Sequence, residues 1–415
     1  MNAPLHDELH VFLNTARIGT LAQDGDALSF AYVPDYVHSP AAYPLSRNLP
    51  LGDDVFHDPE VESFFSNLLP DERIRETVAR IFHISSDNTF GMLKLIGADC
   101  AGAVSFYPAG QTPQSLHEPQ FRDLDEDAAY SILDNLAQRP LDVGDEGVRI
   151  SGAGSQDKLV ACVQDGRVSL PLYGTPSTHI IKPAIPEFPG SVFNELFCMR
   201  LARKCGLPAA DCDILTLKGE PFYVVTRFDR EQVDGVVRRL HQEDFCQLLN
   251  VPPKRKYQVE GGPGIEDCIR RMGEIRLPAV DRLYFIRLVI FNFLTGNCDA
   301  HAKNYAVLYH DGKPSLAPAY DLLSTMIYDN LLKHFAIKIG GENRMGMIGR
   351  TQFERMAELC GLKPKLVLTE LKQMAESLPG AAQGLADELN KQYPNSVYGQ
   401  CVWEIGKLCG QVVRD

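Results

Sequence analysis

Apolar and polar positions alternate near the start of the chain and then change to a helical spacing. Residues 17–33 alternate on both sides of a Gly-Asp pair, which predicts two strands joined by a turn. Residues 58–82 carry apolar positions at helical spacing, so we expect one helix with Asp58 as its cap and Pro59 in its first turn. Residues 100–108 are mostly apolar and predict a further strand.

A polar stretch at residues 136–147 ends this first part, and we take it as a domain boundary. Short apolar segments beyond it, at 158–163, 179–182 and 222–228, predict strands. Residues 191–208 lie between the second and third of these segments and have a helical pattern.

From about residue 240 onward the pattern is mostly helical, with a glycine-rich break and one hairpin-like segment. A strand-rich piece followed by a helix-rich piece predicts two lobes with a cleft between them. The expected fold class is therefore α+β, a bilobal protein-kinase-like fold preceded by a mixed α/β N-terminal domain. We place that domain at 1–140 and the second domain at 141–415, with its lobes at about 141–240 and 241–415.

Composition places the chain among ordinary soluble globular proteins. Its 415 residues are 45% hydrophobic and 23% charged, and this length predicts two or three domains. The formal net charge of −13 disfavours direct, nonspecific nucleic-acid binding, because that requires clustered lysine and arginine. A local basic patch or a basic partner stays open.

Cysteine usage and hydropathy indicate a reducing cytoplasm and no membrane. The eleven cysteines are odd in number, scattered, and form no Cys-x-x-Cys pair. The first residues show no basic region followed by an apolar core, so no signal peptide is evident. The longest apolar run, 284–294, is interrupted by Arg287 and is shorter than the roughly 20 residues that a bilayer needs.

The sequence GNCDAHAKNY, residues 296–305, places four chemically active side chains directly after that apolar run. Asp299 and His301 form a D-x-H pair, the spacing with which some metallophosphatases hold a first metal ion. Such a site needs further ligand pairs, and downstream only scattered His and Asp residues occur. Aspartate and asparagine also cap or turn a chain, so a polar turn is a second interpretation.

Phosphoryl transfer is the third interpretation. Protein kinases use a catalytic aspartate, an asparagine five residues later that binds Mg²⁺, and a second metal-binding aspartate farther on. Asp299, Asn304 and Asp321 have this spacing. Lys303 lies where it could meet the charge of the transferred phosphate.

The remaining parts of a kinase have candidates upstream. Lys182 ends a β-branched run and could hold nucleotide phosphates, and Glu195 on the following helix could pair with it. Residues 151–158 are rich in small side chains that let backbone N–H groups approach phosphate oxygens. Thr226 to Phe228 end a strand where the character of the chain changes, which makes them candidates for an adenine-binding hinge.

The chain resembles the HipA family, the kinase toxins of bacterial type II toxin–antitoxin operons. In the N-terminal part the resemblance rests on the blocks PLSRNLPL, FFSNLLPDERIR and DNTFGMLKLIGADCAGAVSFYP. In the second part it rests on SGAGSQDK, THIIKP, NELFCMRLARKCGL, TRFDR, QEDFCQLLN, KYQVEGGPGI, GNCDAHAKNYAVL and LAPAYDLLST. Together these blocks cover nearly the whole chain in order.

The resemblance implies a Ser/Thr protein kinase that uses ATP and Mg²⁺. It implies that Asp299 is the catalytic aspartate and that Asn304 and Asp321 bind the metal. The ATP-binding residues that it implies are Ala153, Gly154, Ser155, Gln156, Asp157, Lys158, Lys182, Thr226, Arg227, Phe228, His301, Ala302, Lys303, Asn304, Tyr320 and Asp321.

The resemblance also implies regulation by autophosphorylation and a partner. Ser151 matches the serine whose phosphorylation ejects the phosphate loop and inactivates the enzyme in this family. The loop reads AGSQ where AGAQ is expected, so Ser155 is an alternative site. The implied partner is a HipB-like helix-turn-helix antitoxin through which the chain reaches operator DNA.

The implied substrate is a protein, with an aminoacyl-tRNA synthetase as the family example, and the implied outcome is growth arrest and persistence. A catalytically silent co-repressor subunit is the alternative from another functional class.

Overall fold

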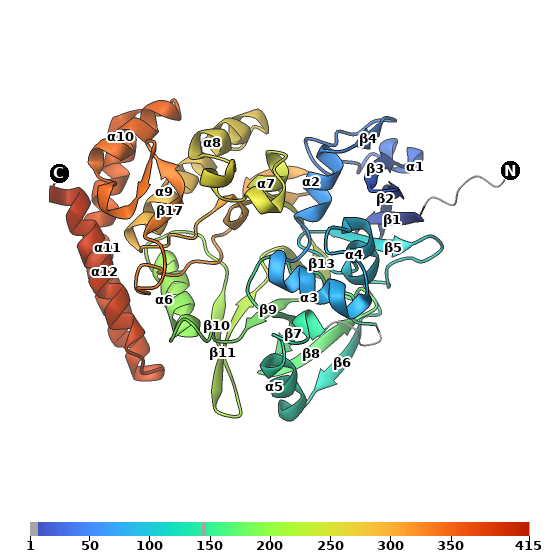
Figure 1. Cartoon of the computed structure of the whole chain (residues 1–415), viewed down its shortest axis with the longest axis horizontal. Coiled ribbons are helices and arrows are strands. Elements are labelled where there is room, and N and C mark those ends of the chain that lie inside the picture. Colours follow the sequence, from blue (N-terminus) through green and yellow to red (C-terminus); the bar gives the residue numbers. More distant parts are fainter. Residues whose placement is uncertain (1–6, 143–146, 415) are drawn as a thin grey trace. The chain divides into compact units, whose positions relative to one another are not determined.

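The computed structural model (Figure 1) describes residues 7–142 and 147–414, and its contacts divide the chain into two compact units. Unit 1 contains the described residues up to Pro183 together with Leu215–Lys254 and Leu308–Lys313. Unit 2 contains Ala184–Ile214, Arg255–Val307 and the described residues from Pro314 onward. The start of the chain and residues 143–146, within the stretch that we take as the boundary, lie outside the described residues, so the boundary stays a prediction.

Unit 1 begins with a five-stranded antiparallel sheet in the order β4-β3-β2-β1-β5. The two strands expected at 17–33 are β2 and β3, and the strand expected at 100–108 is β5. The bounds are β1 (Asp7–Leu13), β2 (Ala16–Asp24), β3 (Ala27–Tyr32), β4 (Val55–His57), β5 (Val104–Pro108) and, for the first helix, α1 (Pro34–Val37).

The single helix expected at 58–82 is wrong, because the structure has two helices there. Helix α2 spans Glu60–Ser66 and α3 spans Glu72–Phe82. Pro70 lies in the break, where it lacks the N–H that a continuous helix would need. Asp58 does accept a hydrogen bond from Glu62 N at 2.9 Å, as a residue before a helix often does. Helix α4 (Thr89–Ile96) follows.

A second, six-stranded sheet has the order β10-β11-β9-β7-β8-β6. It contains the three strands expected from the apolar segments, as β7, β9 and β11. Its strands and the elements beside it are β6 (Gln120–Leu124), α5 (Glu126–Asp134), η1 (Pro140–Asp142), β7 (Leu159–Gln164), β8 (Arg167–Leu172), β9 (His179–Lys182), β10 (Cys212–Leu217) and β11 (Glu220–Thr226). Four further elements follow it, β12 (Arg230–Val233), β13 (Val236–Arg239), β14 (His241–Asp244) and α7 (Phe245–Leu248).

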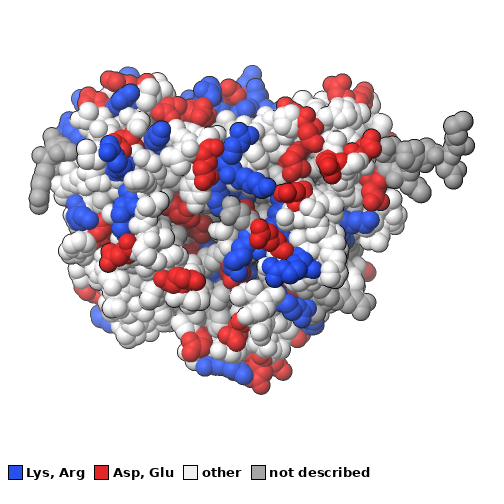
Figure 2. All heavy atoms as spheres, in the orientation of Figure 1, with Lys and Arg blue, Asp and Glu red and all other residues white. Residues whose placement is uncertain are grey.

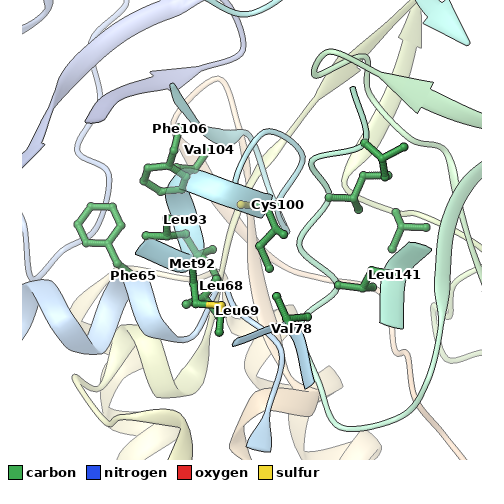
Figure 3. Close-up of a cluster of buried hydrophobic side chains, with 14 of the residues drawn as sticks. Phe65, Leu68, Leu69, Val78, Met92, Leu93, Cys100, Val104, Phe106 and Leu141 are labelled. Carbon is green, nitrogen blue, oxygen red and sulfur yellow. The ribbon is translucent and has the colours of Figure 1, made fainter. Parts of the chain in front are cut away.

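One hydrophobic core joins the two sheets of unit 1. It contains Phe30 and Leu93 from the first part of the chain and Leu159 and Ile181 from the second sheet. In the close-up, side chains of α2, α3, α4 and β5 converge, and Leu141 of η1 lies beside them (Figure 3). The N-terminal part and the strands after residue 150 therefore bury their apolar faces against a common interior, which stabilises both.

Unit 2 is mostly helical. The helix expected at 191–208 is α6, and the apolar run 284–294 lies inside α9. The two C-terminal helices, α11 and α12, pack along each other, and α6 and α9 contact them (Figure 1). The elements are α6 (Ser191–Lys204), η3 (Gln258–Glu260), α8 (Ile265–Glu274), α9 (Ala279–Leu294), η4 (Ala302–Asn304), β17 (His334–Ile339), β18 (Glu342–Arg344), η5 (Met345–Met347), α10 (Arg350–Leu359), α11 (Pro364–Gln392) and α12 (Val397–Arg414).

The hairpin expected after residue 304 is formed by β15 (Ala306–His310) and β16 (Lys313–Leu316), and its tip at Leu308–Lys313 belongs to unit 1. A short 3₁₀ helix, η2 (Pro253–Arg255), lies where the chain passes from unit 1 to unit 2. In the part of the chain that the structure describes, no helix is long and apolar enough to cross a bilayer. Acidic and basic side chains are interspersed on the face shown in Figure 2.

His241 predicts a pH dependence of the stability of unit 1. Its Nε2 lies 2.7 Å from the Leu45 carbonyl oxygen and donates to it, and burial lowers the pKa of the imidazole to about 4. As the pH falls below 6.5, the ordinary pKa, His241 binds a proton in the unfolded chain but stays neutral in the folded chain until the pH approaches 4. The free energy of unfolding therefore decreases with falling pH. Between pH 7.5 and pH 5.0 we expect a loss of about 2 kcal/mol in the free energy of unfolding from this group.

Urea unfolding followed by circular dichroism at both pH values tests this. His241→Gln should reduce the loss by about 2 kcal/mol, whereas His310→Gln, at an exposed position in the β15–β16 hairpin, should leave the loss unchanged. An equal pH dependence in His241→Gln and wild type would contradict the assignment.

Candidate active site

The polar stretch after α9 begins at a turn that requires glycine. Helix α9 ends at Leu294, and Gly296 then has a left-handed backbone with φ of 72°. A Cβ atom at Gly296 would lie 2.8 Å from the Cβ of Met326. The Gly296 carbonyl accepts hydrogen bonds from Thr325 N at 2.9 Å and from Met326 N at 3.0 Å. The turn is therefore tied to the segment that follows Asp321.

Asp299 and Asn304 are brought together within this turn. The main-chain carbonyl of Asp299 accepts from His301 N at 2.7 Å and from Asn304 Nδ2 at 3.1 Å. The 3₁₀ helix η4 carries the chain from one to the other. Because the amide nitrogen of Asn304 is engaged as a donor, its amide oxygen is the atom suited to a cation.

The Asp299 side chain is oriented by a residue distant in sequence. The Tyr257 hydroxyl donates to Asp299 Oδ1 at 2.5 Å, and the Tyr257 ring meets the His301 ring edge-on at 5.1 Å. Gln258, the next residue, accepts from Lys338 N at 2.6 Å and so fixes this segment to β17. No role for Tyr257 follows from the sequence alone. Its only signal is its place in the block KYQVEGGPGI.

Tyr320 and Asp321 complete the cluster in unit 2. The Tyr320 hydroxyl donates to the Lys303 carbonyl at 2.6 Å. Ala319 N donates to the Pro208 carbonyl at 2.9 Å, which fixes the preceding backbone. Asp321 has φ of 58°, a region that is uncommon for residues with a side chain and that recurs at functional positions. The structure therefore places Asp321 beside the turn that carries Asp299.

His301 is a buried group with an unsatisfied ring atom. Burial lowers the pKa of its imidazole, and the nearby Asp299 and Asp321 carboxylates only partly oppose this. His301 is therefore neutral at neutral pH. Its Nδ1 has no hydrogen-bond partner among the described residues, which is unusual for a buried polar atom and marks a place for a ligand.

In unit 1, the small-residue loop at 151–158 is held by the break between α2 and α3. Ser151 is buried, and its hydroxyl donates to the Leu68 carbonyl. Farther along the loop, Arg73 forms an ion pair with Asp157 at 2.8 Å. The break between α2 and α3 thus holds the start of the loop through Leu68, and α3 holds its end through Arg73.

The middle of the loop wraps around a lysine. Gly154 has φ of 102°, and its carbonyl accepts from Asp71 N at 3.2 Å. The Lys158 ammonium donates to the Ala153 carbonyl at 2.5 Å. Ser155, by contrast, is exposed. The loop therefore has an ordered backbone around a buried cation, with Ser155 on its surface.

Lys182 ends β9 and is buried in unit 1. Its ammonium lies 5.7 Å from the centre of the Tyr223 ring, on the neighbouring strand β11. Glu195 is buried in α6 of unit 2. The pairing of Lys182 with Glu195 stays a prediction.

A buried cluster of opposite charges connects the loop to the end of β11. The Asp99 carboxylate accepts from Arg230 Nη2 at 2.8 Å and from Arg239 Nε at 2.9 Å. It also accepts from the Ser177 hydroxyl at 2.5 Å, and Arg227 Nη1 lies 3.5 Å from it. The main-chain carbonyl of Asp99 meanwhile accepts from the backbone N of the loop's first residue at 3.1 Å.

The arginines determine the charge state of Asp99. Burial by itself would raise the pKa of this carboxyl, but the guanidiniums of Arg230, Arg239 and Arg227 outweigh that effect and hold the pKa well below its ordinary value. Asp99 is therefore ionised whenever unit 1 is folded near neutral pH.

The cluster also fixes the hydrogen-bond partners of the Arg227 side chain. Its guanidinium donates to Asp229 at 2.7 Å, and its backbone N donates to the Thr178 carbonyl at 2.9 Å. The Arg227 side chain is therefore occupied inside unit 1, and a contact between Arg227 and adenine would have to use the backbone carbonyl of Arg227. Thr226 is exposed and Phe228 is half-buried.

The candidate residues fall into two sets. Unit 1 holds the loop, Lys182 and the end of β11, whereas unit 2 holds Glu195 and the cluster from Asp299 to Asp321. Among the described residues, no group of three or more His, Cys, Asp or Glu side chains is arranged to hold a metal ion. A strand-rich unit with a loop and a buried lysine, and a helical unit with this Asp–Asn–Asp set, define a protein-kinase-like class of enzyme.

Comparisons with known proteins specify the family. The HipA-like C-terminal domain matches residues 150–382, and the HipA N-terminal domain matches residues 9–107. The putative kinase Y4mE of Sinorhizobium fredii is 39% identical over 395 residues, covering 94% of each chain. The serine/threonine-protein kinase toxin HipA of Shewanella oneidensis is 30% identical over 388 residues, covering 90% of this chain and 88% of the relative.

A solved structure agrees with these matches. The complex of Shewanella oneidensis HipA with HipB and its operator DNA superimposes with a TM-score of 0.86 at 26% identity, covering 98% of this chain and 97% of that chain. The chain belongs to the HipA family. The expected α+β kinase-like fold class is confirmed.

Removal of the Asp99 charge should destabilise unit 1. Asp99→Asn leaves three buried arginines short of one carboxylate, and breaking such a cluster costs about 3–5 kcal/mol. Asp53→Asn, an exposed matched substitution, should stay within about 0.5 kcal/mol of wild type. Urea unfolding of the three proteins at pH 7.5 measures both effects, and equal stability of all three would show that the cluster is not needed.

Proposed function

We propose that this chain is an ATP-dependent serine/threonine protein kinase and the toxin of a HipBA-type toxin–antitoxin module. The observation that carries the proposal is the cluster in unit 2, where Asp299 and Asn304 share one hydrogen-bonded turn and Tyr320 is bonded to the same turn ahead of Asp321. Membership of the HipA family, whose relatives include named kinases, supports it.

Asp299 is the proposed catalytic residue. Its Oδ1 accepts the Tyr257 hydroxyl, which leaves Oδ2 to accept the proton of an incoming serine or threonine hydroxyl. The substrate oxygen forms a bond to the γ-phosphorus as the bond from phosphorus to the β,γ-bridging oxygen breaks, and ADP leaves. Tyr257 acts as a positioning residue, because it holds the carboxylate in one orientation.

The donor set fits a magnesium ion and a triphosphate. The Asn304 amide oxygen and the Asp321 carboxylate are hard oxygen ligands of the kind that Mg²⁺ prefers, and the ion would neutralise phosphate charge. Lys303 and the neutral, unsatisfied His301 lie on the same turn and could meet phosphate oxygens. The backbone of 153–158 and Lys182 are the proposed phosphate-binding groups of unit 1, and backbone groups of 226–228 are the proposed adenine contacts.

Asp299→Asn should lower incorporation of phosphate from radiolabelled Mg²⁺-ATP by about 10²–10⁴-fold, because an amide cannot accept the hydroxyl proton. Asp311→Asn, the same substitution at an exposed position in the β15–β16 hairpin, should retain wild-type incorporation. Autophosphorylation of the purified full chain measures this. No incorporation by wild type would favour the co-repressor alternative, and equal incorporation by all three proteins would remove Asp299 from catalysis.

We further infer that autophosphorylation at Ser151 switches the enzyme off. The Ser151 hydroxyl donates to the Leu68 carbonyl in a buried place, and a phosphate of about −1.5 to −2 charge at this position would replace that donor with negatively charged oxygens facing the carbonyl oxygen. A phosphate on exposed Ser155 would leave this contact intact. Modification of Ser151 therefore requires the loop to leave its place and prevents its return.

During incubation with Mg²⁺-ATP, mass spectrometry should find phosphate on Ser151, with activity decaying in parallel. Ser151→Ala should stay active through the same incubation, and Ser155→Ala should decay like wild type. Phosphate on Ser155 alone, together with loss of activity, would contradict the switch at Ser151 and support the alternative site.

The proposed partners follow from the family. The solved relative is a HipA bound to HipB and operator DNA, and we assign this chain a HipB-like antitoxin through which it reaches DNA. The net charge of −13 supports indirect contact with DNA. All eleven cysteines, each within the described residues, are free thiols, which supports a reducing cytoplasm. The proposed substrate class is a protein, an aminoacyl-tRNA synthetase included, and the proposed consequence is growth arrest and persistence.

A further inference from the structure

A cavity in unit 2 lies outside the cluster described above. It has a volume of about 620 Å³ and is lined by the segment after Asp321, including Met326 and Asp329, and by α12, including Trp403 and Glu404. Its volume is in the range of ligand-binding clefts. None of the proposed catalytic steps uses it.

The α12 side of the cavity presents an acidic group beside an aromatic ring. The Glu404 side chain is only 4% exposed, and it pairs with Lys407 Nζ at 2.9 Å. The same ammonium lies 5.2 Å from the centre of the Trp403 ring. Trp403 is the only tryptophan of the chain, and it is 67% exposed. A nearly buried carboxylate beside an exposed indole is a site for a cation.

Lys407 fills this site from within its own helix. Its side chain is 51% exposed. The two contacts described above, with the Glu404 carboxylate and the Trp403 ring, are both made by its terminal ammonium. An arginine would suit the same two groups better, because a planar guanidinium can stack on an indole and donate two parallel hydrogen bonds to a carboxylate. Asp329 adds a second acidic group to the lining, and the ammonium of Lys333, the second lysine of the lining, donates to the carbonyls of Met326 and Tyr328.

The cavity is connected to the proposed catalytic turn. Thr325 and Met326 donate to the Gly296 carbonyl, and the Thr325 hydroxyl accepts from Cys298 N at 2.8 Å. The Lys333 ammonium donates to the Met326 carbonyl at 2.7 Å, so the backbone of Met326 is held on both its N–H and its carbonyl side. A peptide bound in the cavity would therefore contact the same backbone segment that positions Asp299, the residue after Cys298.

We propose that this cavity binds an arginine side chain of the protein substrate, with the guanidinium over Trp403 and paired with Glu404 in the place that Lys407 now occupies. The proposal rests on the proposed kinase function, because it names a feature of that enzyme's substrate. The net charge of −13 is complementary to a basic segment.

Fluorescence of Trp403 tests the proposal directly, because no other tryptophan contributes. The probes are tryptophan-free glycine–alanine octapeptides with one serine and one arginine at varied spacing, and the same peptides with citrulline, an uncharged isostere. We expect at least one arginine peptide to change the emission and to bind about tenfold more tightly than its citrulline counterpart. Equal binding of each pair, or no change in emission with any of the peptides, overturns the proposal.

Substitutions on α12 give the second test. Lys407→Ala should tighten binding of the arginine peptide about tenfold by vacating the site, and Glu404→Gln should weaken it by a similar factor. The exposed pair Lys372 and Glu376 on α11 provides matched controls, and Lys372→Ala and Glu376→Gln should leave binding unchanged. If Glu404→Gln does not fold, Lys407→Ala decides alone, because its side chain is half-exposed, and unchanged binding then overturns the proposal.

The two proposals fail in different ways. Binding is measured without ATP, whereas self-labelling is measured without peptide. An enzyme that labels itself, but whose KM for the arginine peptide is unchanged by Lys407→Ala, overturns the arginine site and leaves the kinase function intact. Retained peptide binding in a chain that does not label itself overturns the kinase function, and with it the assignment of the bound segment as a substrate. Binding of free arginine amide as tightly as of the peptides would show a small-molecule site and would overturn the assignment to a protein segment.

Discussion

The Asp99 carboxylate and its arginines are the interaction on which unit 1 depends. Charged groups removed from water cost several kcal/mol each, so such a cluster is stable only when its partners are all in place. Asp99 comes from the N-terminal part of the chain, whereas Arg227, Arg230 and Arg239 come from the end of the second sheet or just after it. The main-chain carbonyl of Asp99 also accepts a hydrogen bond from Ser151 N at the start of the loop at 151–158. The N-terminal part of the chain therefore helps to position the proposed phosphate-binding groups.

A comparable constraint holds in unit 2, although it is made of neutral groups. The carbonyl of Gly296 and the hydroxyl of Thr325 join the turn to the segment after Asp321 through four hydrogen bonds. Tyr257 then fixes the carboxylate that this turn presents. The proposed role of Asp299 as proton acceptor would gain from such rigidity, because reaction requires one narrow arrangement of donor and acceptor.

The break between α2 and α3 shows how an error in predicting one helix can hide the backbone groups that hold the loop at 151–158. The apolar spacing at 58–82 is continuous enough to indicate one helix, yet Pro70 cannot supply the hydrogen bond that continuation requires. The segment that leaves the helical path exposes the Leu68 carbonyl and Asp71 N, and both bind the loop. Pro70 can be read from the sequence, but the sequence does not show that the backbone groups beside it bind Ser151 and Gly154.

The sequence by itself determined several strands of both sheets of unit 1, helix α6, the mostly helical character of the chain after about residue 240, the small-residue loop, and the spacing that brings Asp299 and Asn304 into one turn. These features depend on neighbours a few residues apart, so periodicity and spacing record them. Only the tertiary structure decided that Arg227 is buried against Asp99, 128 residues away, and that Tyr257 donates to Asp299, 42 residues away. Such pairs leave no periodic signal, because an arginine or tyrosine has a specific partner only after folding has removed water from both groups.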